Sequence, residues 1–474
     1  MNDVRRIGKN TLLLITSQII FSIVALLISI FIARILGDVA FGKYSIANAF
    51  PSIFTVFLDL GYTTLLIREV SKDKSLSDKY LSNALKLRLI LFPVILIILV
   101  LSVNILGYPD TTKNIVYLFS IFVFLRTVTN IFYGTFRAFQ KMEYEAAILI
   151  LTTILRLSLG LIILSLGYGL IELGFIFVFS GVLEFFIALV ICRKKFITKF
   201  QMQNSFIRNT IKTALPIGML SIFGIIYVRI DTVMLSLFKG DAVVGWYNAA
   251  YNLVLGFTFI PILFMHSLLP VMSIYYVSSK EALKKAYEKS FKYLFILGLP
   301  ISVGIFILAD KFILLFYGKD FINSFVALQI LAWDVLLYFL TTCTGFVLIS
   351  TEKQNQMAIT LAFSAVLNIT LNLFLIPQFS YVGAGIATLV CELFLLIVYL
   401  YLNTKNSFTI DIKKIFLPPS IACCLMGIFL YTFSEIHLII IISCAMIFYI
   451  LLLILFKGLT KDDFLLFKKL IKKH

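Results

Sequence analysis

The chain has 474 residues, of which 61% are hydrophobic and only 14% are charged, and its mean hydropathy is +1.03. Soluble domains carry about a quarter charged residues, so this composition excludes a soluble globular protein and indicates an integral membrane protein. The formal net charge of +17 would suit a nucleic-acid partner, but the distribution of the basic residues along the chain argues against one.

Apolar runs long enough to cross a bilayer follow one another along the chain. Each crossing needs roughly 20 mostly apolar residues, and backbone groups in lipid must bond internally, so the spans are predicted to be helices. We expect an all-α integral membrane protein with about fourteen transmembrane helices. In chain order they cover residues 11–33, 43–67, 86–106, 114–136, 145–166, 171–192, 210–237, 245–274, 291–310, 325–350, 356–376, 383–402, 415–433 and 436–456.

Most of the 41 lysine and arginine residues fall in alternate connections between these spans. The basic connections include residues 68–88, 193–212 and 280–292, and the tail 457–473 is also basic. The positive-inside rule places these segments and both termini in the cytoplasm. We therefore expect a multi-pass protein of the cell (plasma or inner) membrane, whose basic loops attract anionic lipids and which has no nucleic-acid partner.

Two predicted outer turns have nearly the same sequence. GDVAFGKYSIA (37–47) and GDAVVGWYNAA (240–250) share five identities at a constant offset of 203. Glycine permits a tight turn, the aspartates suit the N-terminus of the following helix, and Tyr44 and Tyr247 are expected at the outer membrane interface. A second, weaker repeat between the two halves aligns Glu184 with Glu392 at an offset of 208.

These two sequence repeats predict a duplication into two six-helix lobes of the same orientation, related by a pseudo-two-fold axis along the membrane normal. The N-terminal lobe would cover residues 1–192 and the C-terminal lobe residues 213–402. Residues 193–212 would form a cytoplasmic linker, either as an amphipathic helix on the inner leaflet or as a plain connection. Residues 403–474 would add two further spans and a basic cytoplasmic tail.

Ionisable residues within apolar spans are costly and usually face a cavity or a partner. Arg126, Arg156 and Arg229 are candidates for a cationic cavity that binds an anionic headgroup, because arginine binds phosphate through two N–H groups and stays charged. A structural ion pair such as Arg156–Glu184 is the alternative. Arg229 and Asp231 are two residues apart and therefore point to different faces of one helix.

Acidic and amide side chains within the spans have two readings as well. Glu184, Glu392 and Asp231 are candidates for coupling transport to H⁺ or Na⁺, with structural hydrogen bonding as the alternative. Asn368 and Asn372 lie one helical turn apart, where they would either contact sugar hydroxyls or join helices through hydrogen bonds.

The sequence contains no signature of an enzyme: it has neither a glycine-rich phosphate loop nor an HExxH motif. Its three histidines are too far apart in the sequence to suggest a metal site. We expect no cofactor and no metal, and a secondary transporter that acts as a monomer.

Short motifs follow one another in a fixed order, within a resemblance to a known family that runs from about residue 5 to residue 402. They are Arg34-Ile-Leu-Gly37, Phe41-Gly42-Lys-Tyr44, Asp59-Leu-Gly61, Arg68-Glu69, Asp231-Thr-Val-Met-Leu235, Val244-Gly245-Trp-Tyr247, Asn368 with Asn372 before Pro377, and Glu392. In these motifs the chain resembles the polysaccharide transporter (Wzx-type, O-antigen flippase-like) branch of the multidrug/oligosaccharidyl-lipid/polysaccharide exporter superfamily.

The resemblance implies two six-helix lobes that form a V around a central cavity and work by alternating access. It implies a substrate of oligosaccharide on an isoprenoid (pyro)phosphate lipid, moved from the cytoplasmic to the outer leaflet. Arg34, beside the first duplicated turn, joins the substrate-binding candidates, because a positive residue there could meet the headgroup on exit or anchor to lipid phosphates.

Three alternatives stay open. A multidrug or small-cation exporter of the same superfamily would want acidic rather than basic residues within its spans. A lipid II-type flippase for cell-wall precursor would share both the cationic cavity and the two additional spans. A membrane polymerase or ligase would need a large outer catalytic loop, which the sequence lacks.

Overall fold

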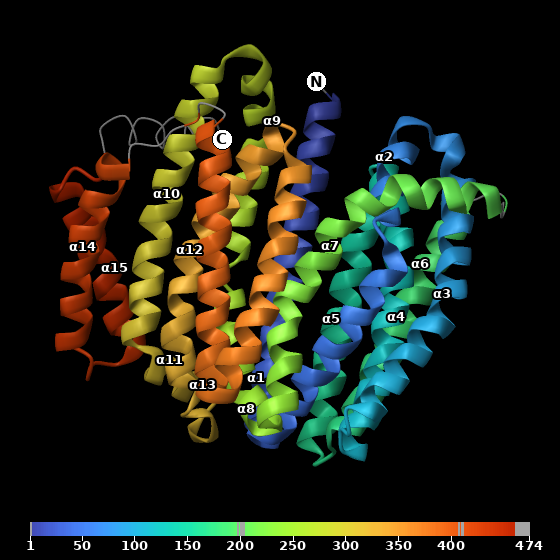
Figure 1. Cartoon of the computed structure of the whole chain (residues 1–474), viewed down its shortest axis with the longest axis horizontal. Coiled ribbons are helices and arrows are strands. Elements are labelled where there is room, and N and C mark those ends of the chain that lie inside the picture. Colours follow the sequence, from blue (N-terminus) through green and yellow to red (C-terminus); the bar gives the residue numbers. More distant parts are fainter. Residues whose placement is uncertain (1, 197–198, 200–203, 406–407, 409–411, 460–474) are drawn as a thin grey trace. The chain divides into compact units, whose positions relative to one another are not determined.

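The structure is a computed structural model that describes residues 2–196, 199, 204–405, 408 and 412–459 (Figure 1). Most of the central part of the predicted linker and nearly all of the predicted basic tail lie outside the described residues. The basic residues before the first span lie in a helix whose first side chains are likewise outside the description.

All regular elements of the described residues are helices. Two are short 3₁₀ helices, η1 (Lys74–Leu76) and η2 (Lys319–Phe321). The α-helices are α1 (Asn2–Asp59), α2 (Tyr62–Lys72), α3 (Ser77–Ile105), α4 (Asp110–Ala138), α5 (Met142–Ser165), α6 (Leu170–Lys195), α7 (Asn204–Lys239), α8 (Asp241–Leu255), α9 (Phe259–Ser278), α10 (Lys280–Ile307), α11 (Ala309–Phe316), α12 (Ser324–Ser350), α13 (Gln354–Lys405), α14 (Ile412–Thr432) and α15 (Leu438–Leu455).

Twelve helical segments of the described chain are long and apolar enough to cross a membrane. Two of them contain a break: in α1, Gly37 has φ 78° and ψ −178°, and in α13, Ser380 has φ 56° and ψ −137°. Figure 1 shows that α1 reverses its direction at such a break. Glycine adopts positive φ at little cost, which explains its place in the first break. The all-α membrane fold is confirmed, whereas the number fourteen stays a prediction; the two breaks are where further crossings would arise.

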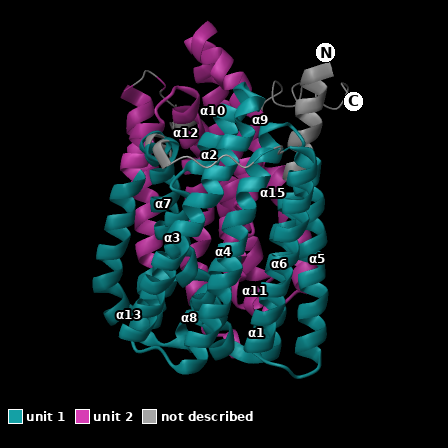
Figure 2. Ribbon diagram, turned by 90° about the vertical axis from the view of Figure 1, so that its right-hand side faces the viewer, with its two compact units in different colours: residues 1–252, 361–384 teal, residues 253–360, 385–474 magenta. Residues whose placement is uncertain are grey.

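The chain divides into two compact units (Figure 2). Unit 1 comprises residues 1–252 and 361–384, and unit 2 comprises residues 253–360 and 385–474. Within unit 1, α1 packs against α4, α5 and α7, and α4 packs against α6. Within unit 2, α10 packs against α12 and α14, and α14 packs against α15. These units follow from spatial contacts; the lobes 1–192 and 213–402 follow from the sequence repeat and stay a prediction.

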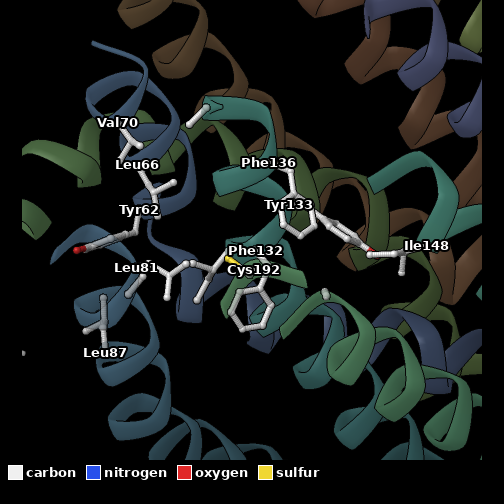
Figure 3. Close-up of a cluster of buried hydrophobic side chains, with 14 of the residues drawn as sticks. Tyr62, Leu66, Val70, Leu81, Leu87, Phe132, Tyr133, Phe136, Ile148 and Cys192 are labelled. Atoms are coloured by element: carbon white, nitrogen blue, oxygen red, sulfur yellow. The ribbon is translucent and has the colours of Figure 1, made fainter. Parts of the chain in front are cut away.

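A buried apolar cluster in unit 1 holds the short helix α2 against its neighbours (Figure 3). Tyr62, Leu66 and Val70 are spaced at four-residue intervals on α2, so they form one apolar stripe. Phe132 and Phe136 of α4 belong to the same cluster, as do residues of α3, α5 and α6. The eleven-residue helix α2 is too short to span a bilayer, and this packing fixes its position in the unit.

Candidate functional site

The two duplicated turns contact each other within unit 1. A Cβ atom added at Gly42 would overlap the backbone carbonyl of Asp241, and one added at Gly245 would overlap the backbone carbonyl of Asp38. The contact is reciprocal, because each turn offers its second glycine to the aspartate of the other turn. Only a residue without a side chain allows two backbones to approach this closely.

Polar side chains reinforce the contact between the turns. The indole Nε1 of Trp246 donates a hydrogen bond to Asp38 Oδ2 at 2.9 Å. Lys43 Nζ lies 4.0 Å from Asp241 Oδ2. Lys43 and Trp246 each follow the second glycine of their turn, so the two aspartates take their partners from equivalent positions. Asp38 also accepts a hydrogen bond from the backbone N–H of Val39 at 2.8 Å, at the start of the helical segment after the break.

The tyrosines of the repeat pack inside unit 1. Tyr247 is 1% exposed and its hydroxyl donates to Asp231 Oδ2 at 2.8 Å. Tyr44 meets the rings of Phe119 and Phe177 edge-on, with centroids 5.7 and 6.0 Å away. The prediction that these tyrosines anchor at the outer membrane interface is wrong for Tyr247, because its hydroxyl is satisfied by a buried carboxylate instead of by water.

A buried polar cluster joins α7, α8 and the first half of α13. Asn372 Nδ2 donates to Asp231 Oδ1 at 2.6 Å and to Asn368 Oδ1 at 2.9 Å. Asp231 is 3% exposed, and both asparagines are fully buried. Among the described residues, Asn372 Oδ1 and Asn368 Nδ2 have no hydrogen-bond partner. Carboxylate and amide oxygens are the ligands that hard cations prefer, and an amide can rotate to present its oxygen.

Arg156 forms a buried ion pair with Glu184 in unit 1. Its Nη2 lies 3.6 Å from Glu184 Oε2, and its Nε donates to Ser180 Oγ at 2.9 Å. The other carboxylate oxygen accepts a hydrogen bond from the Tyr133 hydroxyl at 2.9 Å. The guanidinium also lies over the ring of Phe122, 4.7 Å from its centroid. This arrangement is the structural ion pair that the sequence left as the alternative to a cavity-facing arginine.

Arg126 and Arg229 have a different environment. The guanidinium of Arg126 lies 4.9 Å from the ring centroid of Phe21, and its charge acts on Arg156. Arg229 interacts electrostatically with the hydroxyl group of Tyr251. Both arginines are half-buried. Within the described part of the chain, neither forms an ion pair with a carboxylate. Unit 1 therefore presents two cations within apolar helices that are not neutralised locally.

The remaining sequence candidates lie elsewhere. Arg34 is exposed on α1, three residues before the break at Gly37. Glu392 is buried in unit 2 on α13, where its charge acts on Tyr338 and Tyr399. The structure thus brings Asp231 together with the two asparagines, and Arg156 together with Glu184 and near Arg126.

Sequence reasoning missed Arg88, which it counted among the basic residues of an inner loop. Arg88 lies on α3, is 1% exposed and forms an ion pair with Asp59 at the end of α1. It also donates to Thr63 Oγ1 at 2.7 Å and to the Thr127 carbonyl at 2.5 Å. The network holds the junction between α1 and α2, where Gly61 has φ 79°. The only available signal was an aspartate at the end of an apolar run.

The same junction touches α7. A Cβ atom added at Gly61 would overlap the backbone of Gly218, and one added at Gly218 would overlap the backbone of Leu60. The helical segment 38–59 is therefore fixed to the α7–α8 region at both ends, by the duplicated turns at one end and by this glycine pair at the other.

Comparison with known proteins adds the following relationships. A family model described as "Polysaccharide biosynthesis protein" matches residues 7–276, and the MatE family model matches residues 216–374. The "Capsular polysaccharide biosynthesis protein CapF" of Staphylococcus aureus is 24% identical over 409 residues, which are 83% of this chain and 98% of the relative. The "Probable low-salt glycan biosynthesis flippase Agl15" of Haloferax volcanii is 28% identical over 175 residues, which are 35% and 36% of the two chains.

Two groups of solved structures share the fold. The lipid II flippase MurJ in an inward closed conformation superposes with a TM-score of 0.77 at 17% identity, covering 92% of this chain and 97% of the other. An inward-facing multidrug resistance MATE family transporter of the MOP superfamily superposes with a TM-score of 0.66 at 16% identity, covering 81% and 95%. The helices described above therefore have the arrangement found in these transporters.

Proposed function

The chain belongs to the family of polysaccharide biosynthesis proteins, and from this we propose that it is a flippase for lipid-linked oligosaccharide. It would move a glycan carried on an isoprenoid (pyro)phosphate from the cytoplasmic to the outer leaflet by alternating access. The names of its relatives, a capsular polysaccharide biosynthesis protein and a glycan flippase, support this substrate class. A transporter fold rather than an enzyme fold supports the mode of action.

The observation that carries the proposal is the pair of locally unneutralised arginines in unit 1. A guanidinium removed from water without a counter-charge is costly, so its presence within a membrane-spanning helix calls for an anionic partner. The ring of Phe21 offsets part of this cost for Arg126 and orients its guanidinium. A (pyro)phosphate headgroup supplies the missing negative charge and the oxygen pairs that arginine binds through two N–H groups.

The contact between the duplicated turns supports alternating access. Under the predicted topology these turns would lie on the outer side, where their backbone contact would close the route between residues 37–47 and 240–250. Release of the headgroup to the outer leaflet would require this contact to open. Arg34 is exposed and lies three residues before Gly37 of the first turn, and in this proposal it would meet the headgroup at that step.

We propose that the cluster of Asp231, Asn368 and Asn372 couples transport to Na⁺ or H⁺. Its carboxylate and two amides are buried, and its members come from α7 and α13. A cation bound there would draw these two helices together, so its binding and release would change how they pack. Glu184 remains a weaker candidate, because Arg156 already compensates its charge.

The distribution of basic residues supports the remaining parts of the proposal. The protein would lie in the plasma (inner) membrane with both termini in the cytoplasm, its basic loops near anionic lipids, and would act as a monomer. A lipid II-type flippase is the second candidate, because the MurJ fold superposes over 92% of the chain. A multidrug exporter fits less well, because an organic cation would meet the two arginines.

The test uses purified protein in liposomes that contain a fluorescent undecaprenyl-diphosphate-linked oligosaccharide. Quenching from outside would measure how much of the lipid each leaflet holds. The wild-type protein should equilibrate the glycan lipid between the two leaflets, and Arg126→Ala should lower the rate of this flipping at least tenfold. Arg208→Ala, which removes an exposed arginine of α7, is the matched control and should flip normally. Normal flipping by Arg126→Ala, or flipping of lipid II alone by wild type, would contradict the proposal.

A further inference from the structure

A pocket lies within unit 2 between α9, α12 and α13. Its volume is about 320 Å³, and residues that carry polar groups contribute to its lining: His266, Thr341, Thr342, Tyr338 and Tyr399. Ligand pockets for small molecules begin at about this size, and this one is large enough for a hexose ring. None of the candidates for headgroup binding discussed above lines it.

The lining combines flat apolar surfaces with hydrogen-bonding groups. Phe346 meets His266 edge-on at a centroid distance of 4.9 Å, and Met357 adds an apolar surface. Thr341 is 7% exposed, and its hydroxyl has no hydrogen-bond partner among the described residues. A buried hydroxyl without a partner is costly, so a ligand that supplies one would be favoured. A pyranose fits this combination, since its C–H faces are apolar and its rim carries hydroxyls.

The charges around the pocket restrict the kind of sugar. Among the residues that the structure describes, no lysine, arginine or carboxylate lines it. The negative charges of Glu392 and Asp334, both buried in unit 2, act on Tyr338. An anionic sugar such as a uronate would be repelled in this low-dielectric environment, whereas a neutral hexose would not.

A glycine keeps the floor of the pocket open. A Cβ atom added at Gly345 would come within 3.3 Å of Met357 Cε and 3.5 Å of Tyr399 Cε2. The branches of a larger side chain would extend into the space between these two groups. The depth of the pocket therefore depends on the absence of a side chain at this position.

The position of the pocket suits loading from the cytoplasm. Ile349 of the lining lies one residue before the end of α12, and Met357 lies in the first turn of α13. Under the predicted topology, the turn between these helices is on the cytoplasmic side. The pocket is thus in the half of unit 2 that a headgroup made in the cytoplasm reaches first.

We propose that this pocket is a sugar subsite that binds one neutral hexose unit of the glycan during loading, separately from the arginines that bind the phosphate. The inference rests on the proposed function for the origin of the sugar. It assigns recognition of the glycan to unit 2 and recognition of the charge to unit 1.

The experiment uses the purified full-length protein in lipid nanodiscs and two probes that differ at one carbon, methyl glucoside and methyl glucuronide. Saturation-transfer difference NMR should detect the glucoside on wild type and give a weaker signal for the glucuronide. Thr341→Val should weaken glucoside binding about fivefold to tenfold, because one hydrogen bond is lost at constant shape. Gly345→Val should abolish it by filling the floor.

Thr432→Val on an exposed face of α14 is the matched control and should bind like wild type. Melting temperatures within a few degrees of wild type establish that the variants fold. Absence of glucoside binding to wild type, wild-type binding by folded Thr341→Val and Gly345→Val, or preference for the glucuronide would each overturn the subsite. Glucoside binding by a wild type that does not flip glycan lipid would instead overturn the proposed function and leave the pocket standing.

Discussion

Gly42 lies against the backbone carbonyl of Asp241, 199 positions away in sequence, with no room for a Cβ atom between them. Gly245 and Asp38 repeat this contact in reverse. Because the two contacts come from the same sequence motif, replacing either glycine should disturb the same interface, the one between the two duplicated turns.

Gly42→Ala should therefore destabilise unit 1. The added methyl group would have to separate two helix backbones, and overpacking of this kind costs about 1–3 kcal/mol. A lower melting temperature in detergent, measured by the fluorescence of a thiol dye or by circular dichroism, would show it. Gly304→Ala in α10 is the control, since nothing lies within 4 Å of its added Cβ and the helix should gain stability slightly. Equal melting temperatures for both variants would refute the close contact.

The hydrogen bond between Trp246 and Asp38 should be measurable by a double-mutant cycle. Trp246→Phe and Asp38→Asn should each lower stability, and their combination should lower it by less than the sum. A coupling free energy of about 0.5–1.5 kcal/mol is expected for one hydrogen bond. Strict additivity would mean that the indole N–H and the carboxylate do not interact.

Asp231→Asn should uncouple transport from the ion gradient. Removing the charge weakens the binding of a cation to the cluster. The asparagine amide keeps the size of the side chain and still offers a hydrogen-bond acceptor to Tyr247. Flipping in liposomes should then proceed at the same rate with and without a Na⁺ or H⁺ gradient. Asp310→Asn on an exposed face of α11 should keep the wild-type response. A gradient response retained by Asp231→Asn would exclude this cluster as the coupling site.

Because Arg156 and Glu184 form a buried ion pair, replacing one of them should lower stability far more than replacing both. Glu184→Ala leaves a buried guanidinium without a counter-charge, which costs about 3–5 kcal/mol. The double variant Arg156→Met with Glu184→Leu removes both charges and should recover most of the lost stability. Thermal unfolding of the three proteins decides the matter: a double variant as unstable as the single one would argue against the ion pair.

The sequence predicted what a single helix or a local pattern can reveal. Long apolar runs predicted the membrane helices, and the family resemblance is confirmed, whereas the repeat of two six-helix lobes stays a prediction. The pairing of Asp231 with Asn372 was not predictable, because the two residues are 141 positions apart and local periodicity says nothing of such contacts.

Arg88 and Tyr247 show a second limit of prediction from the sequence. Both were interpreted from their positions relative to the predicted spans, the first as a loop cation and the second as an interfacial aromatic. In the structure each meets a carboxylate from another segment, half-buried Asp59 and buried Asp231 respectively. A polar group near the end of an apolar run can face water or a buried partner, and the sequence does not distinguish these environments.

The reciprocal contact of the duplicated turns has a consequence for the origin of the molecule. Two identical copies of one turn, related by a two-fold axis, make such a contact in an isologous dimer, where each copy offers the same surface to the other. Under the predicted duplication, a six-helix ancestor with one Gly-Asp turn would already have carried a self-complementary surface. Joining two such ancestral genes end to end would then have required no new interface, and Lys43 and Trp246 would have been free to diverge.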